Sequence, residues 1–109
     1  MELLVVVAIL GILVAIAIPN FTSRQGKAYD ARIVEDARNA ATAEEAYFVD
    51  FGEYYEGVDC RDMPGVTVSA GASCSVSLTA SGFEIETSHP RASRTCHWST
   101  GTIPNLICS

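Results

Sequence analysis

The chain begins with a long apolar run, and its hydrophobic pattern changes twice further along. Residues 3–18 contain no polar side chain. These 16 residues, rising 1.5 Å each, predict a helix of about 24 Å, somewhat short of the roughly 30 Å hydrocarbon core of a bilayer. No Lys or Arg precedes the run, and it continues into Ile18-Pro19-Asn20 rather than into a small-residue cleavage site. We therefore expect an apolar helix that the working protein retains, not a cleaved secretory signal.

A second stretch, from Arg24 to Phe51, has the period of an amphipathic helix. Its apolar stripe consists of Ile33, Val34, Ala37, Ala40, Ala41, Tyr47, Phe48 and Phe51. Its opposite face alternates in charge, as in a solvated or intersubunit surface, through Arg24, Lys27, Asp30, Arg32, Glu35, Asp36 and Arg38. Together with the apolar run, this pattern predicts one long helix of about 75 Å, kinked near Pro19 and ending near Gly52.

From Val66 onward the apolar positions alternate with a period of two, which indicates strands. The alternating segments are Val66–Val68, Cys74–Leu78, Phe83–Thr87 and Thr95–Trp98. A short turn at residues 80–82 and a longer one at residues 89–93 separate the last three segments. We predict an α+β fold in which a three- or four-stranded antiparallel sheet packs its apolar face on the stripe of the long helix, with the C-terminal tail held by Cys108.

The length and net charge of the chain limit the classes of function that we expect. A chain of 109 residues supports one domain and leaves no room for a large multi-layer enzyme. The net charge of −6 argues against nucleic acid as a partner, because phosphate binding needs clustered Lys and Arg. No Ser-His-Asp set, phosphate-binding loop or pair of catalytic carboxylates can be placed, so we expect no enzyme. We divide the chain into an apolar N-terminal helix (1–23) and a headgroup (24–109), which comprises an amphipathic helix (24–52), a connecting loop (53–65) and a sheet region (66–109).

The cysteines all lie in the second half of the chain: Cys60, Cys74, Cys96 and Cys108. An even number in a small domain behind a membrane-directing helix predicts two disulfides in an oxidising compartment. Three pairings are possible. We prefer Cys60–Cys74 with Cys96–Cys108, because each closes a loop of about a dozen residues and such a loop contributes about 3 kcal/mol. A metal site built on Cys96, His97 and another thiol is the alternative, although no Cys-x-x-Cys pair is present.

Residues 44–62 carry most of the negative charge. They contain Glu44, Glu45, Asp50, Glu53, Glu56, Asp59 and Asp62, with Arg61 as the only cation. Clustered carboxylates suit calcium, but the Asp-x-Asp-x-Asp-Gly spacing of a calcium loop is absent. We therefore expect a plain acidic surface with no metal and no cofactor, and a calcium site remains the alternative.

Aromatic residues recur along the predicted helix and the loop after it: Phe21, Tyr29, Tyr47, Phe48, Phe51, Tyr54 and Tyr55. A stacked path for charge transport would need ring centroids within about 4.5 to 7 Å. Tyr29 and Tyr47 lie roughly 27 Å apart along a helix. We therefore expect these rings to serve in the core and in subunit contacts.

Glu2 stands immediately before the apolar run. A carboxylate beside so many apolar residues is costly in a membrane and usually marks function. Either it lies at the level of the lipid headgroups, or it pairs with a cation when the helix leaves the lipid and packs with copies of itself. The run contains no Lys or Arg, so an N-terminal ammonium is the cation that we expect at that depth.

The stretch from Glu2 to Phe21 closely resembles the N-terminal helix of type IV pilins and the related major pseudopilins; it reads Glu-Leu-Leu-Val-Val-Val-Ala-Ile-Leu-Gly-Ile-Leu-Val-Ala-Ile-Ala-Ile-Pro-Asn-Phe. The stretch from Ala43 to Tyr54 resembles the end of the same helix, so the resemblance covers residues 2–55. In that family a prepilin peptidase cuts after a glycine, and the new N-terminus, often an N-methylated Phe, precedes Thr-Leu-x-Glu. Here Glu2 follows only Met1, so we expect the natural start to lie upstream.

The resemblance implies a structural subunit of an extracellular filament on the bacterial surface. Family members wait in the inner membrane until an ATPase-driven machine stacks them with their apolar helices at the centre. Glu2 would match the family's Glu that bonds to a neighbour's N-terminus, and Gly11 to Pro19 would match the part of the helix that unwinds in filaments. The implied partners are copies of the same chain, the prepilin peptidase and the pilus assembly machinery.

Two other functions fit the same pattern. One is a major pseudopilin of a type II secretion-like system, and the other is a membrane-anchored binding domain that never polymerises. Calcium held by the acidic loop would favour the pseudopilin, whereas a disulfide from Cys96 to Cys108 favours a pilin. Similar subunits serve in adhesion, twitching motility, DNA capture and long-range electron transfer, and fold alone does not decide among these roles.

Overall fold

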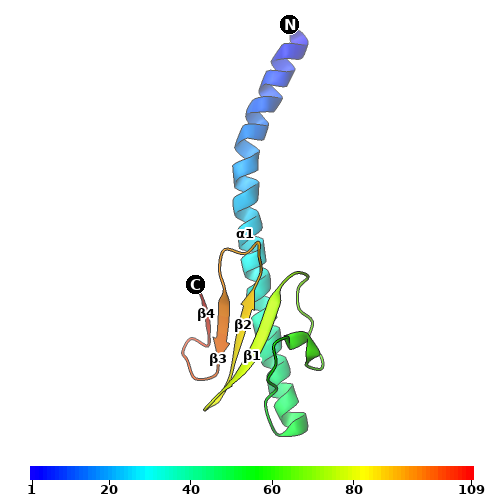
Figure 1. Cartoon of the computed structure of the whole chain (residues 1–109). Helices are drawn as coiled ribbons and strands as arrows, with labels where there is room; N and C mark the ends of the chain where they lie inside the picture. The colour runs from blue at the N-terminus through cyan, green and yellow to red at the C-terminus, as the bar shows by residue number, and fades with distance from the viewer.

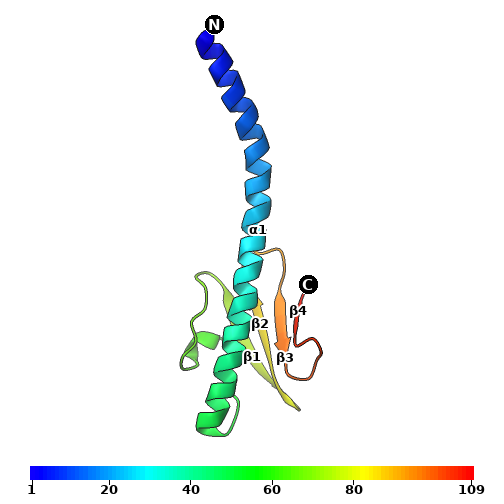
Figure 2. The same cartoon turned by 180° about the vertical axis from the view of Figure 1, so that it is seen from behind.

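The computed structural model covers residues 1–109 and describes every side chain except those of residues 19, 20 and 22. One helix, α1 (Glu2–Phe51), packs against a four-stranded antiparallel sheet (Figure 1). The molecule measures 75 × 26 × 18 Å, because the N-terminal half of α1 projects beyond the sheet (Figures 1 and 2). The predicted α+β class, a long N-terminal helix against a small antiparallel sheet, is confirmed. The predicted kink falls on Pro19, which lies outside the described residues.

Helix α1 ends at the residue that the sequence indicates. Gly52 follows it with φ 74°, a left-handed conformation that a residue with a Cβ adopts only under strain. Its backbone N–H donates to the carbonyl of Phe48 at 2.8 Å, which satisfies one of the last helical acceptors. The chain then reverses direction and returns along the helix towards the sheet (Figure 2).

The sheet has the order β1-β2-β3-β4, with each strand antiparallel to its neighbour in the chain. The strands are β1 (Ser73–Thr79), β2 (Gly82–Ser88), β3 (Cys96–Ser99) and β4 (Leu106–Cys108). Val76 of β1 pairs with Ile85 of β2, which pairs with Trp98 of β3, so these three residues fix the register across the sheet. The short β4 forms where only a tail held by Cys108 was expected.

The strand predicted at Val66–Val68 is absent, and this segment has no regular structure. The backbone just after it, at Ser69 and Ala72, is bound by side chains instead of a neighbouring strand. Asp36 accepts from the Ser69 N–H at 3.1 Å, and the Arg61 guanidinium, from the short 3-10 helix η1 (Cys60–Asp62), donates to the Ser69 and Ala72 carbonyls at 3.3 and 2.9 Å. The alternating valines therefore line the edge of the core without joining the sheet.

The core lies between one face of α1 and the sheet. Ile33, Ala37 and Ala40 are fully buried on the helix, and Phe83 and Ile85 of β2 are buried opposite them. Alanine at two of these helical positions allows close approach of the backbones. The Thr87 hydroxyl, itself buried, donates to the Ile33 carbonyl at 2.8 Å and ties β2 directly to α1.

The last turn of the predicted apolar stripe is less covered than expected. Phe48 and Phe51 remain 43% and 61% exposed, because they lie against loop and helix aromatics rather than under the sheet. Phe48 stacks on Tyr54 at a centroid distance of 4.7 Å, and Phe51 meets Tyr47 at 4.5 Å. The covered part of the helix therefore ends before its last turn.

The four cysteines form two disulfides, Cys60–Cys74 and Cys96–Cys108. The first ties η1 to β1. The second joins β3 to β4 at directly paired positions. Each joins residues close in sequence, with separations of 14 and 12. The headgroup is thus a small sheet fastened at both of its edges.

Removing the disulfide at the β3–β4 edge tests this arrangement. We expect Cys96→Ser combined with Cys108→Ser to lower the free energy of unfolding by about 3 kcal/mol, because the unfolded chain gains the freedom of the opened loop. Urea unfolding of the full chain in detergent, followed by Trp98 fluorescence, measures this change. Ser77→Ala, at an exposed site on β1, is the control and should change stability by less than about 0.5 kcal/mol. A loss below about 1 kcal/mol in the double variant would contradict the prediction.

Candidate assembly surface

The N-terminal part of α1 is uncovered by the rest of the chain. The large apolar side chains between Leu3 and Ile18 are 52–77% exposed. This is the one helix among the described residues that is long and apolar enough to cross a membrane. Apolar surface of this extent marks contact with a membrane or with another protein. The segment is therefore the largest candidate binding surface of the molecule.

Glu2 lies in the first turn of α1 and is exposed. A negative charge at that position is favourable for the helix dipole by about 0.3–1 kcal/mol. Among the described residues no ion pair joins Glu2 to a basic group. Compensation of its charge in an apolar environment must therefore come from outside the chain.

Gly11 lies in regular helix, and a Cβ added to it would meet no atom within 4 Å. The glycine is therefore not required for packing inside the chain, and its effect is on helix stability, which it lowers by about 1 kcal/mol relative to alanine. The other residue expected to help this segment unwind, Pro19, lies outside the described residues. Unwinding between them remains a prediction.

Five of the seven Lys and Arg residues gather where the exposed helix enters the headgroup. We call this group the basic collar: Arg24, Lys27, Arg32, Arg91 and Arg94, all of them exposed. The loop between β2 and β3 contributes the last two. It is held to the helix by Asp30, which accepts from the Ser93 N–H at 2.8 Å, from the Ser93 hydroxyl and from the Arg94 N–H at 3.2 Å. The Ser93 hydroxyl is the main cause that holds the pKa of Asp30 below its ordinary value.

Tyr29 is the second anchor of the collar. Its ring stacks on His89 at a centroid distance of 4.3 Å, and the Arg32 guanidinium lies 5.1 Å from its centroid. The Arg91 guanidinium donates to the Tyr29 hydroxyl at 3.4 Å. One aromatic ring thus holds two cations near each other, with cation–π attraction offsetting part of their repulsion.

The opposite end of the headgroup is acidic. We call its exposed carboxylates the acidic end: Glu45, Asp50, Glu53 and Glu56. Asp59 is separate from them, because it pairs with Arg61 at 3.3 Å and accepts from the Arg61 backbone N–H at 2.9 Å. No group of three or more His, Cys, Asp or Glu side chains converges within the described residues. The arrangement provides negative charge spread over a surface, rather than a ligand cage.

The ring contacts fall into three groups. Tyr47 contacts both Phe51 and Tyr55, with centroid distances of 4.5 and 5.8 Å. Tyr54 links Phe48 to Phe83 of β2, at 4.7 and 4.9 Å. Tyr29 stacks instead on His89 in the collar. The rings near the end of α1 thus close the core beside the acidic end, where several of them stay partly exposed.

Two acids that were placed on the solvated surface are in fact buried. Asp36 is 4% exposed, and its Oδ1 accepts from the Ser69 N–H and hydroxyl at 3.1 and 3.0 Å. Glu44 is fully buried, and neither of its carboxylate oxygens has a hydrogen-bond partner. Burial raises the pKa of Glu44 to about 7, although the nearby Tyr55 backbone N–H offsets part of the effect.

The helical spacing contained the signal for both positions. Asp36 and Glu44 lie three and eleven residues after Ile33, and each lies about one helical turn from Ala40. At 100° per residue both point to the same side of the helix as Ile33 and Ala40. We expected both acids on the solvated face because they are charged, whereas their angular position on the helix places them on the buried face.

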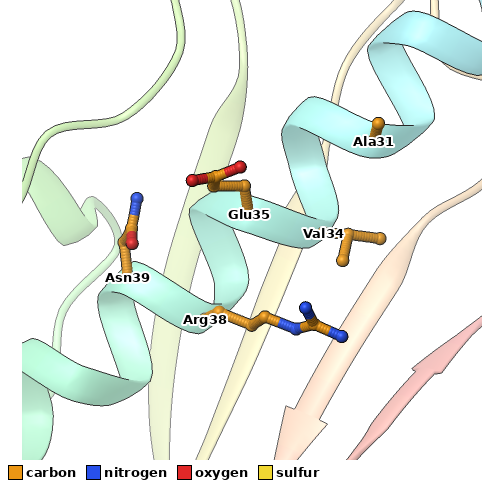
Figure 3. A pocket seen from close by; sticks show the side chains of 5 residues that line it. All are labelled: Ala31, Val34, Glu35, Arg38 and Asn39. Carbon is orange, nitrogen blue, oxygen red and sulfur yellow. The ribbon is translucent and has the colours of Figure 1, made fainter.

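The outer face of α1 contains an open pocket level with the middle of the headgroup. Ala31, Val34, Glu35, Arg38 and Asn39 line it (Figure 3). Ala31 and Val34 contribute apolar side chains to its lining, and Glu35, Arg38 and Asn39 contribute one acid, one base and one amide. The lining therefore combines apolar contact surface with hydrogen-bonding groups.

Comparison of the chain with protein-family models and with curated proteins finds no match. The function is therefore argued from the residues and their arrangement.

Glu44 makes the stability of the headgroup depend on pH. Between pH 4.5 and 7 the folded chain holds a proton on Glu44 that the unfolded chain has lost, so stability falls as the pH rises through this range. Glu44→Gln keeps the shape and removes the charge. We expect this variant to be more stable than the parent at pH 8 by on the order of 2 kcal/mol, and similar to it at pH 4.5.

Urea unfolding at several pH values measures this difference. Glu35→Gln, an exposed position on the same helix, is the matched control and should leave the pH profile unchanged. An unchanged profile in Glu44→Gln would show that Glu44 is not the group responsible.

Proposed function

We propose that the chain is a structural subunit of an extracellular, type IV pilus-like helical filament, assembled by packing of the N-terminal helices. The observation that carries the proposal is the uncovered apolar half of α1, joined without a break to a small headgroup fastened by two disulfides. An apolar helix of this kind is stable in two places, a bilayer or the centre of an assembly of like helices. The likeness of residues 2–55 to type IV pilins favours a protein that uses both.

Localisation and partners follow from this proposal. The subunit waits in the inner membrane, anchored by its apolar helix, with the headgroup on the oxidising side where Cys60–Cys74 and Cys96–Cys108 form. A prepilin peptidase and the pilus assembly machinery then act on it, and the mature filament lies on the outside of the cell. Identical subunits are its main partners, and no nucleic acid or cofactor is required.

The disulfide that closes the C-terminal segment supports a pilin over a pseudopilin, by the criterion stated for Cys96 and Cys108. The acidic residues support neither calcium binding nor the pseudopilin function, since no three of them converge in the described part of the chain. A membrane-anchored domain that never polymerises remains the contrasting hypothesis, and electron microscopy of native material separates it from a filament subunit.

Glu2 provides the test of assembly. We expect Glu2→Ala to leave the headgroup folded and to block filament formation, because the carboxylate neutralises a cation of a neighbour inside the apolar centre. Filament yield by electron microscopy and headgroup folding by circular dichroism are measured together. Glu86→Ala, an exposed acid on β2, is the control and should assemble normally. Normal filaments from Glu2→Ala would remove the proposed role of Glu2, and only monomeric particles from the parent would remove the filament.

A further inference from the structure

The end of the headgroup that faces the apolar helix is positively charged, although the chain as a whole is negative. The basic collar brings five exposed cations to this end, three from α1 and two from the loop between β2 and β3 (Figure 1). Residues 24–32 and 88–95, which carry these cations, contain one acid between them, Asp30. The net charge of the chain is −6, so an anion at this end meets a local charge opposite in sign to that of the whole protein.

The carboxylate of Asp30 does not neutralise the collar side chains. It accepts from the Ser93 N–H at 2.8 Å, from the Ser93 hydroxyl and from the Arg94 N–H at 3.2 Å, so the backbone of the loop occupies it. Within the described part of the chain, the ion pairs join Arg61 to Asp59 and His97 to two glutamates, and none includes a side chain of the collar. The charges of the collar are therefore available to an external anion.

The loop that carries Arg91 and Arg94 is fixed on the helix. The Arg91 N–H donates to His89 Nδ1 at 3.0 Å, so His89 Nε2 carries the proton and donates to the Ala70 carbonyl at 3.2 Å. The His89 ring in turn stacks on Tyr29 of α1 at 4.3 Å. The backbone positions of these two arginines are thus set before any ligand arrives, which lowers the entropy cost of binding.

The length of the apolar run places the collar at the surface of a bilayer. A hydrocarbon core of roughly 30 Å takes about 20 helical residues, so a core that begins at Leu3 ends near residue 22. Arg24 then lies about 3 Å and Lys27 about 8 Å beyond the hydrocarbon, within a headgroup layer of about 5–8 Å. Asp30, which holds the loop, and Arg32 lie about 12–15 Å beyond the hydrocarbon, within about a Debye length of that layer.

The collar is not explained as a signal for membrane orientation. Lys and Arg beside a membrane-spanning helix are ordinarily concentrated on its cytoplasmic side. In the proposed function the headgroup lies on the other side, where its two disulfides form. A ligand on that side of the membrane accounts for five cations at this position.

We propose that the basic collar binds anionic phospholipids of the leaflet that faces the headgroup. Arg24 and Lys27 contact the phosphates, and Arg32, Arg91 and Arg94 hold the headgroup close to the bilayer surface. This inference rests on the membrane stage of the proposed function and names the lipid class that the subunit binds there. Each Lys or Arg near an anionic surface is worth about fivefold in affinity. A basic cluster next to an apolar anchor thus adds a second attachment to the membrane.

Titration of the full chain with lipid measures this binding residue by residue. The chain is held in neutral-detergent micelles, and backbone amide NMR spectra are recorded while phosphatidylglycerol is added. We expect shifts concentrated at Arg24, Lys27 and residues 89–94, with an apparent affinity about tenfold higher than for phosphatidylcholine. The preference should fall below about threefold in about 0.5 M NaCl, because the collar is exposed and salt screens it. Equal affinity for the two lipids would overturn the proposal.

Arg24→Gln has a matched control in Arg38→Gln. The second change removes the same charge from an exposed position of the same helix, about 21 Å further from the apolar run. We expect Arg24→Gln to lower the affinity for phosphatidylglycerol about fivefold and Arg38→Gln to lower it less than about 1.5-fold. Equal losses in the two variants would show that net charge, and not the collar, attracts the lipid.

The loop is tested in the same titration. Arg91→Gln with Arg94→Gln should lower the affinity for phosphatidylglycerol about tenfold, because both side chains lie on the collar. Headgroup folding is checked by circular dichroism. An unchanged affinity in this folded variant would overturn the binding surface that includes the loop.

Two further measurements separate the lipid from other partners. Inorganic phosphate at the same concentration should leave the collar amides unshifted, and shifts as large as those with phosphatidylglycerol would show a site for free anions instead. Filament yield of Arg24→Gln with Lys27→Gln is measured by electron microscopy. If this variant binds phosphatidylglycerol as the parent does and fails to assemble, the collar serves subunit contacts and the inference is wrong. Absence of filaments from the parent would remove the filament proposal, whereas the titration tests the collar by itself.

Discussion

The structure depends on one constraint: the apolar surface of the first third of α1 exceeds what the rest of the chain can cover. The small sheet has one apolar face, and Ile33, Ala37 and Ala40 already occupy it. Nothing remains to bury Leu3 to Ile18, so that segment needs either lipid or other protein. The chain is therefore divided into two parts. The headgroup is built around the half of α1 that the sheet can cover, and the other half is left to external partners.

Much of this fold could be predicted from the sequence, because the helical and strand patterns are long and because a glycine marks the end of the helix. The helix end at Gly52 and the β1–β2 hairpin are of this kind. The segment at Val66–Val68 has the alternation of a strand but none of its pairing. The backbone just after it is bound by side chains, because Asp36 accepts from the Ser69 N–H and Arg61 donates to the Ser69 and Ala72 carbonyls. Asp36 and Ser69 lie 33 positions apart, so no local pattern reveals the bond between them.

The charged residues show a second limit of prediction. Asp36 and Glu44 lie on the buried side of α1, as their helical angle indicates. The prediction failed because charged residues were assigned to the solvated face. The two acids then differ in environment. Asp36 receives two donors from Ser69, whereas Glu44 receives none and burial raises its pKa to about 7. In the sequence the residues of the basic collar are scattered charges. Arg91 and Arg94 join the collar only because their loop is bonded to Asp30, which lies some sixty residues earlier.

The bonds between headgroup and helix have a mechanical consequence. Ser93 is bonded to Asp30, Thr87 to Ile33 and Ser69 to Asp36, so three attachments from three different segments fall within two turns of α1. Tension applied to the headgroup along the axis loads these attachments together, in shear, instead of peeling them apart one after another. The helix then carries the force as a rod pulled lengthwise. A headgroup joined in this way passes an axial load to the helix through several bonds that share it.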